Sequence, residues 1–233
     1  MLASVHIADL GLGRALGLIA KGPARIQADG LRNANLGLAA PLGGGLAPKP
    51  QLGRVALITM WDDDEALDRF VASSPIAHAF AGGWHTRLRP LRTHGSWPGL
   101  PDDLPHSRAV DGDEPVAVLT LGRLRWPRLG PFLRSSAKAG DRAVDAPGLI
   151  WATGLARPPF FATCSLWESA AASAGYAYGA GDAHHDAIAA GRAKPFHHQE
   201  AFVRFRPYSF GGHLDGRNPL GATSLADAGA TPS

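Results

Sequence analysis

Cysteine is almost absent from this chain of 233 residues, in which Cys164 is the only one. A single cysteine excludes an internal disulfide and a cysteine-rich metal site, and we interpret it as a small core residue. Charge is also sparse, because Asp, Glu, Lys and Arg make up only 18% of the residues and leave a net charge of +3. The basic residues form no run with interleaved aromatics, so the composition argues against a nucleic-acid-binding protein.

Long apolar runs are missing as well. No window approaches the roughly 20 apolar residues of a membrane-spanning helix, so we expect no membrane span. The start of the sequence, Met1 to His6, lacks the basic segment, the long apolar run and the small-residue cleavage site of a signal peptide. From these absences we expect a cytoplasmic protein.

What the sequence does contain is a regular succession of short strands and helices. Alternating apolar and polar residues predict strands, and apolar residues at helical spacing after a capping residue predict helices. Arg54 to Trp61 is the clearest strand of the first half, and Asp62 is the predicted cap of the helix that follows. Other strands are expected at 2–10, 27–40, 84–97, 115–122, 148–155, 160–167 and 201–207, with helices at 13–20, 75–80 and 128–139.

The two halves of this succession match each other. Each reads strand, helix, strand, strand, helix, strand, and Trp61 and Trp167 each close a third strand. This repetition predicts an α+β fold, an α+β barrel built from two tandem ferredoxin-like repeats with antiparallel sheets and helices outside. The expected units are a first repeat at 1–100, a linker at 101–113, a second repeat at 114–212 and a disordered tail at 213–233.

One histidine of the second repeat, His184, lies where a flat cofactor could approach it. If the segment from Asp182 is helical, Ala187 and Ile188 share the face of His184, whereas His185 faces water. The imidazole would then point into an apolar space lined by small residues. The same spacing also fits a core histidine hydrogen-bonded to a carbonyl, and the pattern alone leaves both interpretations open.

Other histidines are alternative ligands. His78 follows the tryptophan of its own repeat at the same distance as His184 does, so it could be the pseudo-symmetric counterpart of His184 and a ligand in its place. His197 and His198 could bind a metal together with His184 or His185, but adjacent histidines on a strand point to opposite faces. The sequence has no pattern of a zinc or non-haem iron triad and no nucleophile elbow.

A set of short motifs follows one another along the chain: Pro48-Lys49-Pro50 after a Gly-rich loop, Ser73-Ser74-Pro75, Gly95-Ser96-Trp97, Ser165-Leu166-Trp167, Ala183-His184-x-x-Ala187-Ile188 and Phe202-Val203-Arg204-Phe205. In this order and spacing the chain resembles the spheroidene monooxygenase family of carotenoid-pathway ketolases, over roughly residues 20–210. The resemblance implies a homodimeric haem protein on a dimeric α+β barrel, an architecture shared with dye-decolourising peroxidases, chlorite dismutases and aldoxime dehydratases.

Within that resemblance, His184 is the expected iron ligand of a haem b, and Ala187 and Ile188 pack beside the cofactor. Neutral imidazole suits iron, and an open sixth position lets oxygen or a substrate nitrogen bind. A hydrogen-bond donor is then needed on the opposite side of the iron. The candidates are Arg87, which we assign to cofactor binding, and Arg89, His94 and Ser165, which we assign to catalysis.

The implied function is a haem-dependent monooxygenase that inserts oxygen into an apolar substrate, with a carotenoid as one candidate and an electron donor that the sequence does not identify. Two alternatives stay open. One is a haem-dependent lyase of the aldoxime dehydratase kind, which acts on a nitrogen-containing substrate without an external reductant. The other is a non-catalytic haem-binding protein.

Overall fold

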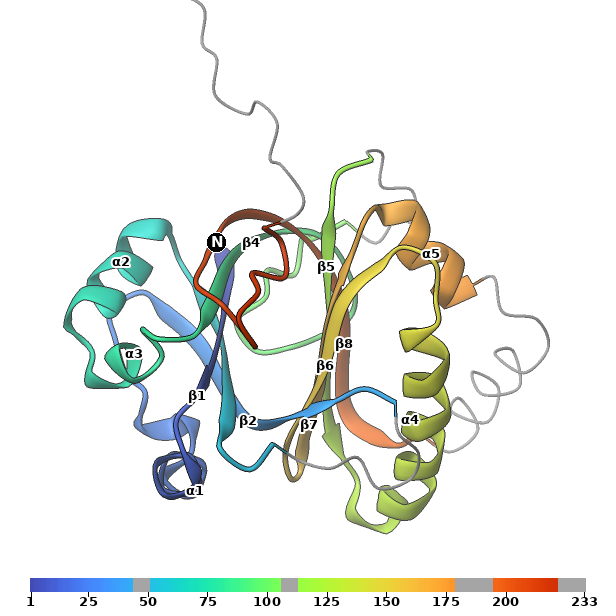
Figure 1. The fold of residues 1–233 in the computed structure, drawn as a ribbon, viewed down its shortest axis with the longest axis horizontal. Helices are drawn as coiled ribbons and strands as arrows, with labels where there is room; N and C mark the ends of the chain where they lie inside the picture. The colour runs from blue at the N-terminus through green and yellow to red at the C-terminus, as the bar shows by residue number, and fades with distance from the viewer. Residues whose placement is uncertain (44–50, 106–112, 179–194, 222–233) are drawn as a thin grey trace, which may run out of the picture.

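The computed structural model describes residues 1–43, 51–105, 113–178 and 195–221. The strands of these residues form one closed antiparallel barrel in the order β1-β3-β2-β6-β7-β5-β8-β4 (Figure 1). They are β1 (Leu2–Asp9), β2 (Leu31–Pro41), β3 (Arg54–Trp61), β4 (Trp84–Gly95), β5 (Val116–Leu124), β6 (Leu149–Arg157), β7 (Phe160–Trp167) and β8 (His197–Gly211). The helices are α1 (Leu12–Lys21), α2 (Asp64–Ser73), α3 (Pro75–Ala79), α4 (Leu129–Val144) and α5 (Ala170–Tyr178), with short 3-10 turns η1 (Pro23–Arg25) and η2 (Trp126–Arg128). The α+β class and the antiparallel barrel predicted from the sequence are confirmed.

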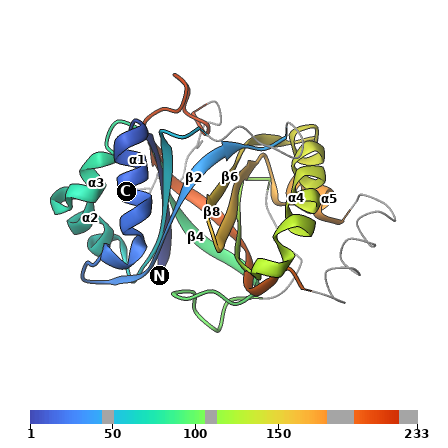
Figure 2. The same ribbon diagram turned by 90° about the horizontal axis from the view of Figure 1, so that it is seen from below.

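Two groups of strands, one from each half of the chain, make up the barrel. The first half contributes the order β4-β1-β3-β2 and the second half β8-β5-β7-β6. Pairing of β4 with β8 and of β2 with β6 joins the two groups. Helices α1, α2 and α3 lie outside the first group, and α4 and α5 lie outside the second (Figures 1 and 2). Among the described residues, no helix has the length and apolar character needed to cross a bilayer.

The barrel is filled with side chains. Alternate residues of each strand point inward, as the two-residue period of a strand requires. On β5 these are Ala117, Leu119 and Leu121, and each is fully buried in the largest apolar cluster of the described residues. Trp84 of β4 and Phe205 of β8 also point inward and are fully buried. The interior is therefore a packed core, and the residues that remain for function lie on the outer faces.

The helix after β3 begins one residue later than predicted. Asp63, not Asp62, is the N-cap, because its backbone is extended and its Oδ1 accepts a hydrogen bond of 2.8 Å from the Ala66 amide. The last strand is longer than the predicted 201–207. It runs over His197–Gly211 because β5 pairs with its first part and β4 with its second.

The predicted disordered tail is wrong for residues 213–221, which fold back onto the barrel. Arg54, whose side chain is only 9% exposed, pairs with Asp9 at 2.7 Å and with Asp215 at 2.6 Å. The indole nitrogen of Trp84 donates to Oδ1 of Asn218 at 3.1 Å. Composition suggested disorder because the segment is polar and Gly-rich, but buried partners distant in sequence supply the interactions that order it. Residues 222–233 lie outside the described residues.

The two halves share a local arrangement around their tryptophans. The indole nitrogen of Trp61 donates to the Thr59 hydroxyl at 2.7 Å, and that of Trp167 donates to the Ser165 hydroxyl at 2.9 Å. Each indole also packs on an aromatic ring of the following helix at the same offset in sequence, with ring centroids 5.0 Å apart for Trp61 and Phe70 and 5.2 Å apart for Trp167 and Tyr176.

A buried histidine lies on the outer face of the first half. Nε2 of His6 is 3.1 Å from the Ser4 hydroxyl, which is in turn 2.7 Å from the Thr59 hydroxyl. The His6 ring also stacks on His85 at 5.9 Å. Burial, together with the nearby charges of His85 and Arg87, lowers the pKa of His6 to about 3. His6 is therefore neutral in the folded protein at ordinary pH.

We expect this histidine to make the protein less stable in acid. The unfolded chain binds a proton at His6 below pH 6.5, whereas the folded chain binds it only near pH 3. The free energy of unfolding should thus fall between these values, by at most about 1.4 kcal/mol per pH unit from this group. Urea unfolding at several pH values should show a shallower slope for His6→Gln than for the wild type. His78→Gln, which changes an exposed histidine, is the control, and equal slopes in His6→Gln and wild type would contradict the assignment.

Candidate functional site

The outer face of the second half differs from that of the first half. On the first half, the outward residues of β3, Val55, Leu57 and Trp61, are fully buried beneath the helices. On the second half, the outward residues in the middle of β5 and β7 carry short hydroxyl-bearing or aliphatic side chains and are only half-buried. Among the described residues, the helices of the second half therefore cover the middle of this sheet less completely than the helices of the first half cover theirs.

Two rows of aligned residues cross this face from β6 to β4. The first row follows the strand register through Ala152, Ser165, Val118, Arg204 and Arg92. The second row runs parallel to it through Gly154, Thr163, Thr120, Phe202 and His94. These ten residues are called the second outer face below. The β6 end of each row is small, the middle carries hydroxyl or aliphatic groups, and the β4 end is basic.

Aromatic pairs between the sheet and the helices bound the second outer face along β7. At the start of β7, Phe161 packs against Phe132 of α4 with ring centroids 5.0 Å apart. At its end, Trp167 stacks on Tyr176 of α5. The two outward residues between these pairs, Thr163 and Ser165, are both small. Because successive outward residues of a strand lie roughly 6–7 Å apart, the helices contact the sheet at both ends and leave its middle to small side chains.

A buried cation lies at the basic end of the rows. Arg92 is 8% exposed, and within the described ranges its side chain has no hydrogen bond or ion pair. Arg204, also 8% exposed, is its partner across β4 and β8. Burial of a guanidinium group away from water is costly unless an anion or hydrogen-bond acceptor compensates it. An anionic or acceptor-rich ligand on the second outer face would supply that compensation.

The structure brings two of the predicted site residues to this face. Ser165 lies in the middle of the first row, where its hydroxyl accepts the Trp167 indole N–H and donates to the Val118 carbonyl at 3.4 Å. His94 lies at the end of the second row, exposed, with its ring 6.3 Å from that of Phe202. Ser165 therefore has a structural role in addition to the predicted catalytic one.

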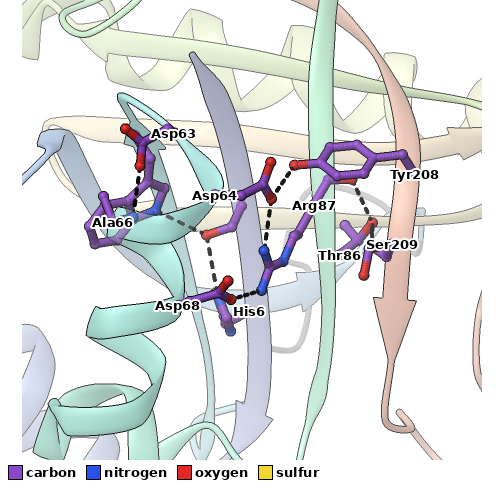
Figure 3. A network of polar contacts seen from close by, with 11 residues as sticks. His6, Asp63, Asp64, Ala66, Asp68, Thr86, Arg87, Tyr208 and Ser209 are labelled. Atoms are coloured by element: carbon purple, nitrogen blue, oxygen red, sulfur yellow. Dashed lines mark hydrogen bonds and ion pairs between the residues drawn. The ribbon is translucent and has the colours of Figure 1, made fainter.

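Arg87 lies elsewhere, on the outer face of the first half, as Figure 3 shows. Its guanidinium donates to Asp64 at 2.7 Å and also to Asp68, both at the start of α2. The Tyr208 hydroxyl donates to the same Asp64 carboxylate at 2.7 Å. Hydrogen bonds from Arg87 and Tyr208 lower the pKa of Asp64 against the opposing effect of burial. The structure does not bring Arg87 together with Ser165 or His94.

Arg89 lies on β4 between Arg87 and the second outer face. Its guanidinium is 4.6 Å from the centre of the Tyr208 ring. It also faces Arg206 across the strand pair, and Arg206 is ion-paired with Glu114 at 2.8 Å. Arg89 is therefore next to the second outer face and outside its two rows. His184, Ala187 and Ile188 belong to the segment 179–194 between α5 and β8, which lies outside the described residues.

The other histidines considered as metal ligands lie away from the second outer face or pair with other groups. His78 is exposed on α3, and its Nε2 donates to the Ala72 carbonyl at 3.1 Å. Nδ1 of His197 is 3.0 Å from Glu200. No group of three or more metal-ligating side chains is present in the part of the chain that the structure describes. Cys164 points into the barrel, where burial raises the pKa of its thiol to about 12, so its interpretation as a core residue is confirmed.

Sequence reasoning missed Arg92, Thr120 and Thr163. The alternation along β5 and β7 could have revealed the two threonines, because each lies between inward apolar neighbours. The same alternation could not identify Arg92 as an outward residue. The register of β4 shifts between Pro90 and Arg92, and this shift changes which residues point outward. A bulge of this kind depends on the partner strand.

In comparisons with known proteins, no family model matches the chain. A spheroidene monooxygenase of Rubrivivax gelatinosus is 33% identical over 180 residues, which cover 75% of this chain and 68% of that protein. The spheroidene monooxygenase of Cereibacter sphaeroides is 27% identical over 82% of this chain, and that of Rhodobacter capsulatus is 28% identical over 78%. The match covers 60% of the length of the Cereibacter protein.

Among solved structures, an aldoxime dehydratase in complex with butyraldoxime superposes with a TM-score of 0.50 at 11% identity. The superposition covers 94% of this chain and 84% of the dehydratase. At this identity the likeness concerns the fold alone, and it agrees with the antiparallel barrel described above.

The Ser165 hydroxyl should contribute to stability whatever its part in catalysis. Ser165→Ala removes the acceptor of the buried Trp167 indole N–H, so we expect the free energy of unfolding to fall by about 1–2 kcal/mol. Ser96→Ala, which changes an exposed serine, should leave it within about 0.5 kcal/mol of the wild type. Chemical denaturation measures both variants. A Ser165→Ala protein as stable as the wild type would show that the indole hydrogen bond contributes little.

Proposed function

The chain belongs to the spheroidene monooxygenase family, and on this premise we propose that it is a haem-dependent monooxygenase that inserts oxygen into an apolar substrate. A carotenoid is the candidate substrate, as the name of the relatives suggests. The observation that carries the proposal is the sequence identity with the Rubrivivax protein across three quarters of this chain. The second outer face supports it, because this face offers small side chains and buried positive charge side by side.

The residues of the second outer face fit a haem b. A porphyrin is flat and apolar across its plane, and the small side chains of Gly154, Thr163 and Thr120 would allow it to approach the sheet closely. Its propionates are anionic, and Arg92 would donate charge-assisted hydrogen bonds to such groups. His184 would hold the iron, with Ala187 and Ile188 beside it. When bound, the haem would supply the activation of oxygen, and insertion of one oxygen atom also consumes two electrons from an external donor.

The chain's own residues would orient the substrate and control protons around the cofactor. His94 lies at the exposed β4 end of the face and Arg89 lies next to the face on the same strand, where both would donate hydrogen bonds to the substrate. The Thr163 hydroxyl would donate to a polar end of the substrate, and the Ser165 hydroxyl would do so on turning its proton away from the Val118 carbonyl. The aromatic pairs of α4 and α5 would exclude water from both ends of β7. These assignments give His94, Arg89 and Ser165 the catalytic roles expected from the sequence.

We also infer that the halves are two tandem ferredoxin-like repeats. Their equal strand orders and their shared hydroxyl–tryptophan–aromatic arrangement support this inference. In that case the second repeat carries the cofactor and the first repeat does not, because large apolar residues fill the corresponding outer face. The homodimer that the family resemblance implies stays a prediction, which the mass of the protein in solution tests.

The haem proposal predicts a Soret absorption band after reconstitution with haem b. His184→Ala should abolish or strongly shift this band because the iron loses its protein ligand, whereas His185→Ala should leave it unchanged. Absorption titration of the purified proteins measures both variants. Equal spectra for His184→Ala and the wild type would reject His184 as ligand. Oxygen and reductant consumption with an apolar polyene then tests the monooxygenase, and turnover of an aldoxime without reductant would favour the lyase.

Arg92 provides a second and independent prediction. Arg92→Met keeps an unbranched apolar side chain and removes the guanidinium charge, so haem affinity should fall by about tenfold through loss of one charge-assisted hydrogen bond. The haem-free protein should be as stable as the wild type or more stable, because a buried cation has been removed. Arg206→Met, which changes an exposed arginine on the neighbouring pair of β8, should keep the affinity. Unchanged haem affinity in Arg92→Met would contradict the proposed role.

A further inference from the structure

Helix α1 carries leucines on its outer side, away from the sheet. Ala15 is its buried contact with the sheet, whereas Leu12 is 53% exposed and Leu16, one turn later, is 47% exposed. Gly13, Gly17 and Ala20 complete the exposed surface between them. A helix that only covers a core normally has polar residues on its outer side, so the outer side of α1 has the composition of a contact surface.

Two further strongly exposed apolar residues belong to segments that hydrogen bonds connect to α1, directly or through one turn. Leu52, 48% exposed, precedes Gly53, whose carbonyl accepts a hydrogen bond from the Leu10 amide at the entry to α1. Trp126 in η2 is 61% exposed. The connection from α1 to η2 passes through the turn between β6 and β7. Nε of Arg157 donates to the Ile19 carbonyl of α1 at 2.9 Å, and the Pro159 carbonyl accepts from the Leu124 amide just before η2.

These elements lie on one side of the molecule. Figure 1 shows α1 and the beginning of α4, which follows η2, at the lower side of the barrel. Figure 2, viewed from that side, shows α1 lengthwise on the outside of the first half. We call this surface the leucine–arginine face, defined by Leu12, Leu16, Leu52 and Trp126 with the exposed cations Arg14, Lys21, Arg25 and Arg125.

The charges of the leucine–arginine face are all of one sign. The segments that form it, 10–28, 51–53, 123–130 and 157–159, contain seven Lys and Arg residues and no Asp or Glu. Within the described ranges, Arg14, Lys21, Arg25 and Arg125 form no ion pair with a carboxylate. Asp9, the acid nearest to Arg14 in sequence, is paired with Arg54, and Asp29 lies just beyond the segment that ends at residue 28. Such a surface attracts anions, and a second copy of the chain in a symmetric contact would place cations against cations.

We propose that the leucine–arginine face docks on the surface of an anionic phospholipid bilayer. Exposed leucines on a short amphipathic helix insert among the acyl chains near the headgroups, and lysine and arginine at their margin pair with lipid phosphates. Tryptophan prefers the same interfacial depth. Val71, which is also strongly exposed, lies instead on the acid-rich helix α2.

Docking of this kind connects to the proposed function because an apolar substrate dissolves in the bilayer and not in water. The leucine–arginine face itself is independent of haem, and vesicle binding is measured without cofactor or substrate. Failure to bind vesicles would therefore leave the haem proposal standing, and failure to bind haem would leave the docking proposal standing.

Sedimentation with vesicles tests the proposal on the full chain. The protein should bind vesicles of phosphatidylcholine and phosphatidylglycerol in equal parts, bind pure phosphatidylcholine weakly, and be released by high salt. Leu12→Gln combined with Leu16→Gln should lower partitioning into the mixed vesicles by about tenfold, since two inserted side chains are lost. Val71→Gln is the matched control, with one exposed apolar residue replaced on α2, and should bind as the wild type does.

Fluorescence quenching provides a second measurement that does not depend on the leucine variants. Trp126 is the exposed one of the six tryptophans, so brominated lipid in the mixed vesicles should quench part of the emission in the wild type and not in Trp126→Phe. Absence of binding to the mixed vesicles, or equal binding of the double leucine variant, would overturn the proposal. So would a change of the mass in solution in the double variant, because the face would then be an interface between copies of the chain.

Discussion

The pairing of β4 with β8 and of β2 with β6 is the constraint on which the rest of the structure depends. Without these pairings each half of the chain would leave strand edges unpaired, and edges of that kind invite association with other chains. With them, every strand of the described barrel has two neighbours and the apolar inward residues of both halves meet in one core. The outward residues are then the only ones available to helices, ligands or membranes.

The two halves have the same strand order, but their outer faces differ in side-chain size. On the first half, Trp61, Leu57 and Phe70 fill the space between sheet and helices, and a buried network around His6 completes it. On the second half, Thr163 and Ser165 occupy the middle of the corresponding strand between two aromatic contacts. The outer face of the first half is therefore filled by large apolar side chains, while the proposed cofactor site on the second half has small side chains and two buried arginines.

The proposed haem site and the leucine–arginine face lie mainly on different halves of the chain. The proposed haem site lies under α4 and α5, and most residues of the leucine–arginine face, including those of α1, belong to the other half. The hydrogen bond from Arg157 to the Ile19 carbonyl connects α1 to the turn between β6 and β7. A lipid-bound α1 would thus be joined directly to the sheet that carries the candidate site, so that one orientation on a bilayer would set the position of both.

The sequence by itself determined the class of fold, the strand and helix order and the family, because these follow from local periodicity and from short motifs such as Ser165-Leu166-Trp167. It also identified Cys164 as a core residue. Only the tertiary structure decided that Asp63 caps α2, that residues 213–221 are ordered by Arg54 and Trp84, and that Arg87 pairs with Asp64 instead of joining Ser165. Arg92 became visible only when the β4 bulge showed which way it points. The physical reason is the same in each case: these positions are set by partners far away in the chain, and local spacing carries no information about which distant residue will be the partner.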